Sequence, residues 1–208
     1  MNMVRKEHIT ALFSILRNPV DGFEQMRFRM RGSRKLATLL YVLFFIAIVA
    51  ERQWTGYLFN FARVERLNIF IMAAMALGIP ALWVISNIAV CTLTDGEGSL
   101  SDIYIVTAYA FLPYILLAPV SIIVSNVLIN KEAAYYALLQ MFQTGWTVLL
   151  LFCGNMTAHQ YSFKKAVATV LLTIMGIIII LFLFFLSFVL IQQLVEFIRT
   201  IVFEISYM

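Results

Sequence analysis

Charged residues divide the chain into five long uncharged runs. The runs cover residues 36–50, 67–94, 103–130, 133–163 and 166–195 and are 15, 28, 28, 31 and 30 residues long. A helix needs about 20 apolar residues to cross a hydrocarbon core of about 30 Å. Four runs exceed that length, and the first reaches it if Lys35 and Arg52 extend their charged ends toward the membrane surface. We therefore predict five transmembrane helices, at about 36–53, 67–94, 103–129, 134–157 and 166–191.

The composition agrees with this pattern. The 208 residues are 62% hydrophobic and 12% charged, with a mean hydropathy of +0.92, whereas soluble domains are about 45–50% apolar and about 25% charged. A membrane β-barrel needs short segments of alternating polarity, but residues 171–191 are apolar on every face. The predicted fold class is all-α, an integral membrane bundle of five transmembrane helices. An interfacial segment (1–35) precedes the transmembrane domain (36–195), and an amphipathic tail (192–208) ends the chain.

The amino-terminal segment is amphipathic and basic. Ile9, Leu12, Phe13 and Leu16 recur at helical spacing, and Asn18-Pro19 ends that run. Residues 20–35 then mix Phe23, Met26, Phe28 and Met30 with the basic residues Arg27, Arg29, Arg31, Arg34 and Lys35. This combination is typical of a segment that lies on an anionic leaflet. It serves either as an ordinary topology signal or as a contact for anionic lipids or a cytoplasmic partner.

The distribution of Lys and Arg predicts the orientation, because basic residues are retained on the cytoplasmic side. With the amino terminus inside, the inner segments carry ten of the 15 basic residues and the outer segments carry five. Most of the excess lies beside the first helix, and no cleavable signal peptide precedes it. We expect a cytoplasmic amino terminus and an external carboxyl terminus.

A polar turn separates the second and third predicted spans. Asp95, Gly96, Glu97 and Gly98 are turn-forming residues, and Ser99 with Asp102 three positions later predicts a capping box that opens the third helix. The turn lacks the ligand spacing of an EF-hand, so we do not expect it to bind a metal. Its acidity instead favours a surface complementary to the basic amino-terminal segment.

Three prolines fall inside the predicted spans. Pro80, Pro113 and Pro119 each remove a backbone hydrogen bond and tend to kink a helix. Two of them in the third span predict a bent helix at the centre of the bundle. Broken helices also occur in transporters, but these usually carry intramembrane charges. The strongest polar groups within the spans are Asn87, Asn126, Gln140 and Gln143, which we expect to form hydrogen bonds between helices.

No catalytic motif is found. HExxH, GxSxG, GxxxxGK[ST] and GxGxxG are all missing from the sequence. We interpret His8 and His159 as surface histidines and Cys91 and Cys153 as inert buried thiols. The glycosylation pattern at Asn155 falls at the inner end of the fourth span, where it is not reached. We therefore expect no enzyme activity, cofactor, metal or nucleic-acid partner.

The residues after the fifth span form an apolar stripe with Glu196, Arg199 and Glu204 outside it. This pattern is typical of a helix that leaves the membrane or lies along its outer face. A continuous helix from Ala166 to Met208 would be about 64 Å long, about twice the hydrocarbon core. The tail must then either bend or project.

Several of these features together resemble the Yip-type membrane protein family, named for eukaryotic proteins that interact with Rab/Ypt GTPases. The similar features are the five-span layout, ILRNPVDGFEQM, the turn DGEGSLSD and the following AYAFLPY. Tyr109, Pro113 and Tyr114 match the family's third span, and Asp95, Gly96 and Gly98 match its preceding turn. The short amino-terminal region is most similar to the bacterial branch. The resemblance implies a multi-pass protein of the bacterial cell membrane with a cytoplasmic amino terminus.

Two functional hypotheses from different classes follow. The first is a non-catalytic scaffold or accessory subunit, which binds anionic inner-leaflet lipids and a membrane-protein partner or a second copy of itself. The second is a small transporter or permease component that uses the proline-broken second and third spans. A membrane enzyme without a recognisable motif is a third, weaker alternative.

Overall fold

The computed structural model describes residues 6–27, 32–60 and 68–206. Five of its helices or helix pairs are long and apolar enough to span a membrane: Arg34–Trp54, Ile69–Leu93, Leu100–Val127, Asn130–His159 and Phe163–Ile205. The predicted all-α fold with five spans is therefore confirmed. The elements are α1 (Lys6–Arg17), α2 (Pro19–Gln25), α3 (Arg34–Trp54), α4 (Ile69–Leu93), α5 (Leu100–Ala110), α6 (Leu112–Val127), the 3-10 helix η3 (Asn130–Glu132), α7 (Ala133–His159) and α8 (Phe163–Ser206).

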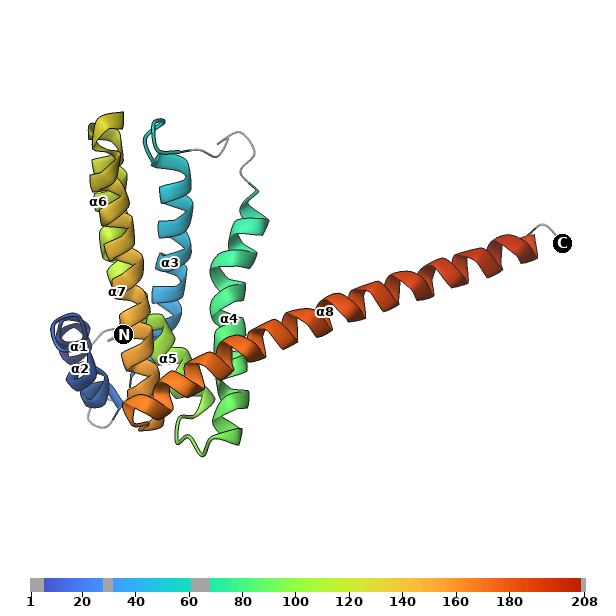
Figure 1. Ribbon diagram of the computed structural model, residues 1–208, viewed down its shortest axis with the longest axis horizontal. Coiled ribbons are helices and arrows are strands. Elements are labelled where there is room, and N and C mark those ends of the chain that lie inside the picture. The colour runs from blue at the N-terminus through green and yellow to red at the C-terminus, as the bar shows by residue number, and fades with distance from the viewer. Residues whose placement is uncertain (1–5, 28–31, 61–67, 207–208) are drawn as a thin grey trace.

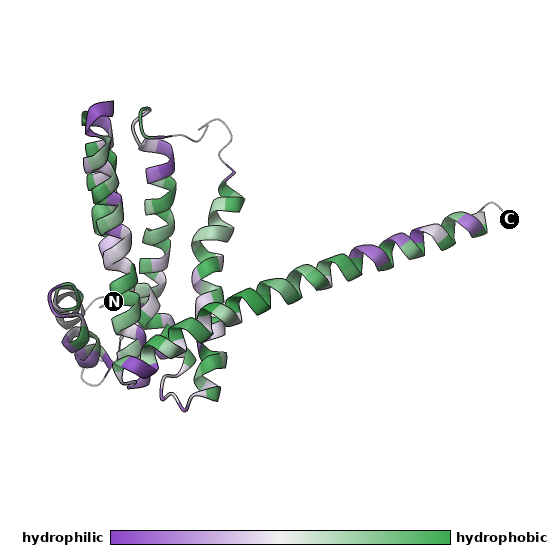
Figure 2. Ribbon diagram, in the orientation of Figure 1, coloured by the Kyte–Doolittle hydropathy of each residue, from purple (hydrophilic) through white to green (hydrophobic). Residues whose placement is uncertain are grey.

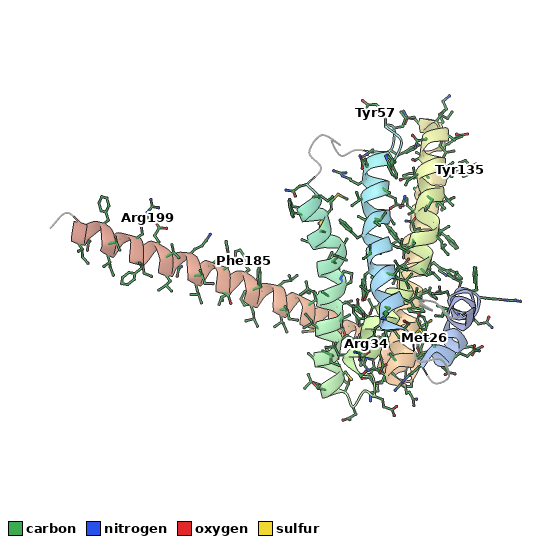
Figure 3. All side chains as sticks on the ribbon, turned by 180° about the vertical axis from the view of Figure 1, so that it is seen from behind. Met26, Arg34, Tyr57, Tyr135, Phe185 and Arg199 are labelled. Carbon is green, nitrogen blue, oxygen red and sulfur yellow. The ribbon has the colours of Figure 1, made fainter. Side chains whose placement is uncertain are left out.

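Helices α3, α4, α6 and α7 run side by side (Figure 1). One end of this bundle, here called the basal end, carries α1, α2 and the turns at 94–99 and 160–162. The opposite, distal end carries η3 and residues 55–60. Figure 3 marks the two ends, with Met26 and Arg34 at the basal end and Tyr57 and Tyr135 toward the distal one.

The α1–α2 hairpin packs against the bundle. α1 ends at Arg17, just before Asn18-Pro19, and Pro19 opens α2, a position where its missing N–H is not needed. Gly22 lies so close to α1 that a Cβ there would come within 2.7 Å of the Ile15 backbone. Ile15 and Phe23 are fully buried, whereas Phe13 is 67% exposed. Of the predicted apolar stripe, Leu12 and Leu16 pack against the core and Phe13 does not.

The third span is broken rather than smoothly bent. α5 ends at Ala110, and α6 begins at Leu112 with Pro113 in its first turn. A proline at this position cannot donate to the carbonyl four residues earlier, so the helix is interrupted there. At the break, the Phe111 N–H bonds to the Ala108 carbonyl at 3.2 Å. Pro80 and Pro119, by contrast, lie inside α4 and α6 without ending them.

An aromatic cluster packs α3 against this break. The rings of Phe44 and Phe111 stack with their centroids 4.0 Å apart, and Tyr114 meets Phe44 edge-on at 5.1 Å. Tyr41 lies 4.8 Å from the ring of Tyr104 and donates a 3.2 Å hydrogen bond to its carbonyl. Each such aromatic pair contributes about 0.5–1.5 kcal/mol beyond the burial of its area. The buried core contains this cluster and extends to Ile15, Phe23 and Leu150 of α1, α2 and α7.

Helix α8 begins at the basal end and projects far beyond the bundle (Figures 1 and 2). Its buried residues Ala166, Thr169 and Thr173 share one face over its first turns, which contact α4 and α7. At Gly176 a Cβ would collide with the Ser86 hydroxyl, so that close approach requires glycine. The 44-residue helix, about 66 Å long, continues without interruption through the predicted tail at 192–206. Within the described chain, the tail projects and does not form a separate element.

Candidate functional site at the basal end of the bundle

The basal end brings the basic segment and the acidic turn together. The Arg27 guanidinium forms an ion pair with Glu97 at 3.3 Å and donates a 2.9 Å hydrogen bond to the Thr157 carbonyl. That carbonyl belongs to the last turn of α7, where backbone acceptors have no helical partner and the helix dipole attracts a cation. Arg34, in the first turn of α3, donates from Nε to the Ser101 hydroxyl at 2.7 Å. The predicted complementarity of segment and turn is present as direct contacts.

The other predicted basic residues are placed differently. Lys35 is exposed on α3, whereas Arg29 and Arg31, with Phe28 and Met30, lie outside the described residues. Phe23 and Met26 are 0% and 3% exposed, so they pack inside the protein. Phe23 approaches Gly154 of α7, where a Cβ would come within 3.1 Å of its ring. Gly154 therefore leaves room for the Phe23 ring against α7.

The turn at 94–99 is closed by local hydrogen bonds. Asp95 follows α4 with a left-handed φ of 51°, and the Gly96 N–H bonds back to the Cys91 carbonyl at 3.2 Å, as in a Schellman motif. The predicted capping box between Ser99 and Asp102 opens α5. At Gly96 and Gly98 a Cβ would come within 2.8 Å of the His159 ring. These glycines are needed because the turn packs on that ring.

His159 is the centre of a buried polar network, here called the histidine network. The Gly98 N–H donates to His159 Nδ1 at 3.3 Å, so Nε2 carries the ring proton and donates to Asn87 Oδ1 at 2.7 Å. The Asn87 amide in turn donates to Asn155 Oδ1 at 2.9 Å and to Thr173 Oγ1 at 3.2 Å. One network thus joins α4, α7, α8 and the turn. His159 is 2% exposed, so its interpretation as a surface histidine was wrong.

Tyr161 covers this network from the turn between α7 and α8. Its ring stacks on His159 at 5.0 Å between centroids, and Lys165 lies 4.8 Å from the ring centre on the solvent side. The Tyr161 hydroxyl shares a 2.6 Å hydrogen bond with Thr94. Burial raises the pKa of this phenol, so it stays protonated at neutral pH. Tyr161 therefore fixes the turn on the bundle without contributing charge.

A second polar network lies in the distal half of the bundle. The Glu51 carboxylate accepts hydrogen bonds from the Tyr114 hydroxyl at 2.5 Å and from the Gln143 amide at 2.8 Å. Ser121 donates to the same Gln143 side chain at 2.7 Å. Sequence analysis missed Glu51, because a charge at the end of an uncharged run was taken to mark the membrane surface. The carboxylate instead joins α3, α6 and α7 from within.

The four predicted polar groups of the spans have different outcomes. Asn87 and Gln143 bond between helices as predicted, and Asn126 donates to the Trp54 carbonyl at 2.9 Å. Gln140 donates to Tyr136 of its own helix, so the prediction is wrong there. Asn155 was missed, although its i, i+4 spacing to His159 places both on one face of α7. Its Nδ2 has no hydrogen-bond partner among the described residues.

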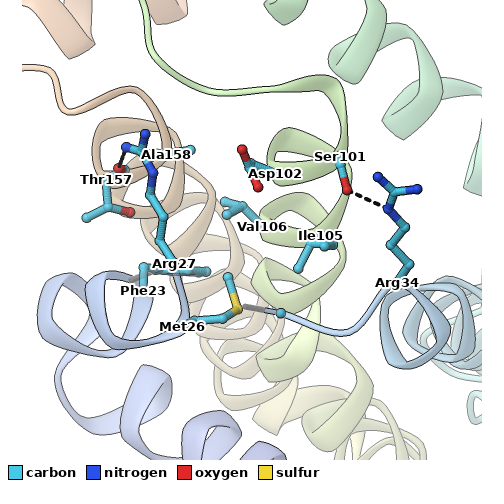
Figure 4. Close-up of a pocket in the computed structure, with 11 residues that line it drawn as sticks. Phe23, Met26, Arg27, Arg34, Ser101, Asp102, Ile105, Val106, Thr157 and Ala158 are labelled. Atoms are coloured by element: carbon cyan, nitrogen blue, oxygen red, sulfur yellow. Dashed lines mark hydrogen bonds between the residues drawn. The ribbon is translucent and has the colours of Figure 1, made fainter. Parts of the chain in front are cut away.

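A pocket of about 390 Å³ opens at the basal end between α2, α5 and α7 (Figure 4). Arg27 and Arg34 lie on its two sides, with Ser101 and Asp102 between them. Phe23, Met26, Ile105 and Val106 supply its apolar lining. Within the described part of the chain, no three His, Cys, Asp or Glu side chains are grouped as a metal site would require. The pocket therefore combines two cations with an apolar wall.

Comparison with protein-family models shows to which family the chain belongs. The Yip1 domain model matches residues 13–186. The chain belongs to the Yip1 family. The matched Yip1 domain includes both polar networks and the pocket, and it ends inside α8. No curated protein and no solved structure matches the chain. Together with the five apolar helices, the Yip1 domain makes this a multi-pass membrane protein.

Proposed function

We propose that this Yip1-family protein is a non-catalytic scaffold or accessory subunit that binds other membrane proteins and lipids. The observation that carries the proposal is the apolar surface of α8. In the most apolar 18-residue stretch of the helix Phe163–Ile205, no residue is buried inside the protein. Many of its large side chains beyond the bundle are exposed, such as Phe184 at 73%. A transmembrane helix with this surface is suited to pack against helices of a partner.

The polar groups support a structural role. Both nitrogens of His159 are engaged in hydrogen bonds within the fold, and the Glu51 carboxylate is held by two donors. General acid–base catalysis needs a group that reaches a substrate proton. Because the polar atoms of His159 and Glu51 are hydrogen-bonded within the fold, a role in holding the helices together is favoured over a role in catalysis.

We infer that the protein lies in the cytoplasmic membrane of a bacterium, with the basal end inside and the carboxyl terminus outside. The supporting observation is the concentration of basic residues at the basal end, where Arg27, Arg34 and Lys35 are found. Basic residues of this kind are retained in the cytoplasm and attract anionic lipid. The lipid partners in this proposal are those of the inner leaflet.

Purification of the tagged protein from its own membranes tests the scaffold role. Mild detergent or native nanodiscs should recover a membrane protein in stoichiometric amount, identified by mass spectrometry. Truncation after residue 176, which removes most of the exposed part of α8, should abolish that recovery while the protein still folds. Recovery of the full-length chain alone would contradict the proposal.

A small transporter is the second candidate, and the broken third span with Glu51 beside it favours this function. Glu51 is an ionisable group within the bundle, and Tyr114, which donates to it, lies one residue after Pro113. Intramembrane acids and interrupted helices often occur together at transport sites. A substrate-dependent flux in liposomes that is lost in Pro113→Ala and Glu51→Gln would favour the transporter over the scaffold.

A further inference from the structure

Two residues that line the basal pocket, Arg34 and Asp102, stand close to the points in the sequence where apolar spans begin. Arg34 lies two residues before Leu36, where one apolar run starts, and Asp102 directly precedes the run that starts at Ile103. The phosphate groups of a bilayer lie just outside the hydrocarbon core. The pocket is thus open at the depth of lipid head groups and not inside the bundle or far from the membrane.

We propose that this pocket binds one phospholipid, with its phosphate at Arg34 and Ser101 and the start of an acyl chain against Met26, Ile105 and Val106. The inference rests on the proposed function, because it names the lipid class bound by the same basal surface. It goes beyond general attraction to an anionic leaflet, since it assigns a single site with a polar and an apolar part.

The polar part is suited to a phosphate ester. Arg34 is exposed, and among the described residues its side chain is bound only through Nε to Ser101. Its two terminal nitrogens can therefore donate to an anion in the paired geometry that guanidinium offers. Ser101 is in the first turn of the 11-residue α5, where backbone N–H groups also favour an anion. Arg27 lies on the opposite wall, where Glu97 offsets part of its charge.

The charges around the pocket leave room for an anion. Asp102 is the acidic residue of the lining, but its carboxylate accepts from both the Ser99 hydroxyl at 2.7 Å and the Ser99 N–H at 3.1 Å. It is therefore held in the capping box. Arg34 and Lys35 both stand in the first turn of α3, where the helix dipole disfavours cations. A bound phosphate would offset this unfavourable placement.

The apolar part favours a lipid over a soluble phosphate. Met26, Ile105 and Val106 line the pocket and keep a small accessible area, and Phe23 lies fully buried behind them. The volume of about 390 Å³ is within the usual range of small-ligand sites and has space for a head group and the first carbons of a chain. Burial of acyl carbon atoms at this wall adds to the binding free energy.

Native mass spectrometry of the full-length protein in mild detergent tests the site. The protein is titrated with phosphatidylglycerol, with diacylglycerol of the same chains, and with glycerol 3-phosphate. We expect one phosphatidylglycerol to bind, while diacylglycerol and glycerol 3-phosphate bind far more weakly. Arg34→Gln should weaken phosphatidylglycerol binding about tenfold, as expected for loss of hydrogen bonds to a charged group.

Lys35→Gln is the matched control. It removes the same charge from the neighbouring exposed position of α3, and Lys35 does not line the pocket. Equal weakening by Lys35→Gln and Arg34→Gln would overturn the site and leave only general attraction. Equal binding of glycerol 3-phosphate and phosphatidylglycerol would overturn the lipid assignment in favour of a free phosphate. Absence of phosphatidylglycerol binding would overturn the inference while leaving the scaffold role, tested by partner recovery, unaffected.

Discussion

At the scale of single residues, buried polar side chains hold the helices of this protein in register. His159, Asn87 and Thr173 connect three helices at the basal end, and Glu51 with Gln143 does so in the distal half. A buried polar group that loses its partner is destabilising, because its desolvation is no longer compensated. These side chains should therefore contribute to stability much more than exposed polar residues.

Replacement of His159 tests the basal network. His159→Ala should lower the free energy of unfolding by about 2 kcal/mol, because it leaves the Gly98 N–H and the Asn87 carbonyl oxygen without partners. For a chain of this size, that loss lowers Tm by about 4–8 °C, measurable by tryptophan fluorescence in detergent. Gln140→Ala is the control, since Gln140 bonds only to Tyr136 of the same helix. Equal shifts for both variants would show that the network adds no special stability.

Glu51 gives an independent test in the distal half. Glu51→Ala leaves the Tyr114 hydroxyl and the Gln143 amide unpaired inside the bundle and should cost about 2 kcal/mol of unfolding free energy. Glu196→Ala, on the exposed part of α8, removes the same charge and should leave Tm within about 1 °C. If Glu51→Ala were as mild as this control, the distal network would not support the packing of α3 on α6 and α7.

Residue roles were only partly predictable from the sequence. The capping box at Ser99 and the turn glycines follow local rules, which act over a few neighbouring residues. Glu51 and His159 were missed because their burial depends on which distant helices pack against them. Each stands near the end of an uncharged run, where a polar residue is ordinarily at the surface. The i, i+4 spacing of Asn155 and His159 was the feature of the sequence that could have indicated a shared polar face on α7.

At the scale of elements, close approaches at glycine determine how the helices dock. At Gly22 α2 packs closely against α1, at Gly154 α7 leaves room for the Phe23 ring, and at Gly176 α8 packs closely against Ser86. Proline determines where the third span breaks, as Pro113 shows. The spans themselves were predictable because their long apolar runs have few alternatives, whereas the hairpin's inward-facing Phe23 and Met26 depend on glycines elsewhere in the chain.

Gly22→Ala tests the hairpin. Its Cβ would meet the Ile15 backbone at 2.7 Å, so α1 must move away, at a cost of about 1–3 kcal/mol. We expect faster cleavage by trypsin at Arg17 in the purified protein, because the docked hairpin protects it. Gly78→Ala is the matched control, since nothing lies within 4 Å of its Cβ, and there the higher helix propensity of Ala should stabilise α4 by about 1 kcal/mol. Unchanged cleavage in Gly22→Ala would contradict the docking of α1.

At the scale of the whole molecule, the protein has two unlike parts. A packed bundle with a basic basal end carries the polar networks and the pocket, and a long apolar helix extends from it with most of its side chains exposed. The number of spans and the basic bias were predictable from the sequence. The direction of α8 was not predictable, because this helix is apolar on all sides and its sequence therefore does not indicate which face packs on the bundle.

The proposed orientation in the membrane rests on the basic residues of the basal end. Tyr57→Cys at the distal end and Glu97→Cys at the basal end replace side chains that are 95% and 61% exposed. With the basal end in the cytoplasm, a membrane-impermeant maleimide should label position 57 in intact cells and position 97 only after permeabilisation. The reverse pattern would contradict the proposed orientation. Loss of the exposed Arg27–Glu97 ion pair is expected to have little effect on folding.

Photocrosslinking from α8 in native membranes tests the scaffold role most directly. A photoreactive phenylalanine analogue replaces Phe185, which is 65% exposed beyond the bundle, and a second variant carries it at Tyr57 in the distal loop as control. We expect a discrete crosslink to a different membrane protein from position 185 that is absent from position 57. Crosslinks from position 185 only to lipid, or only to another copy of the chain, would contradict it.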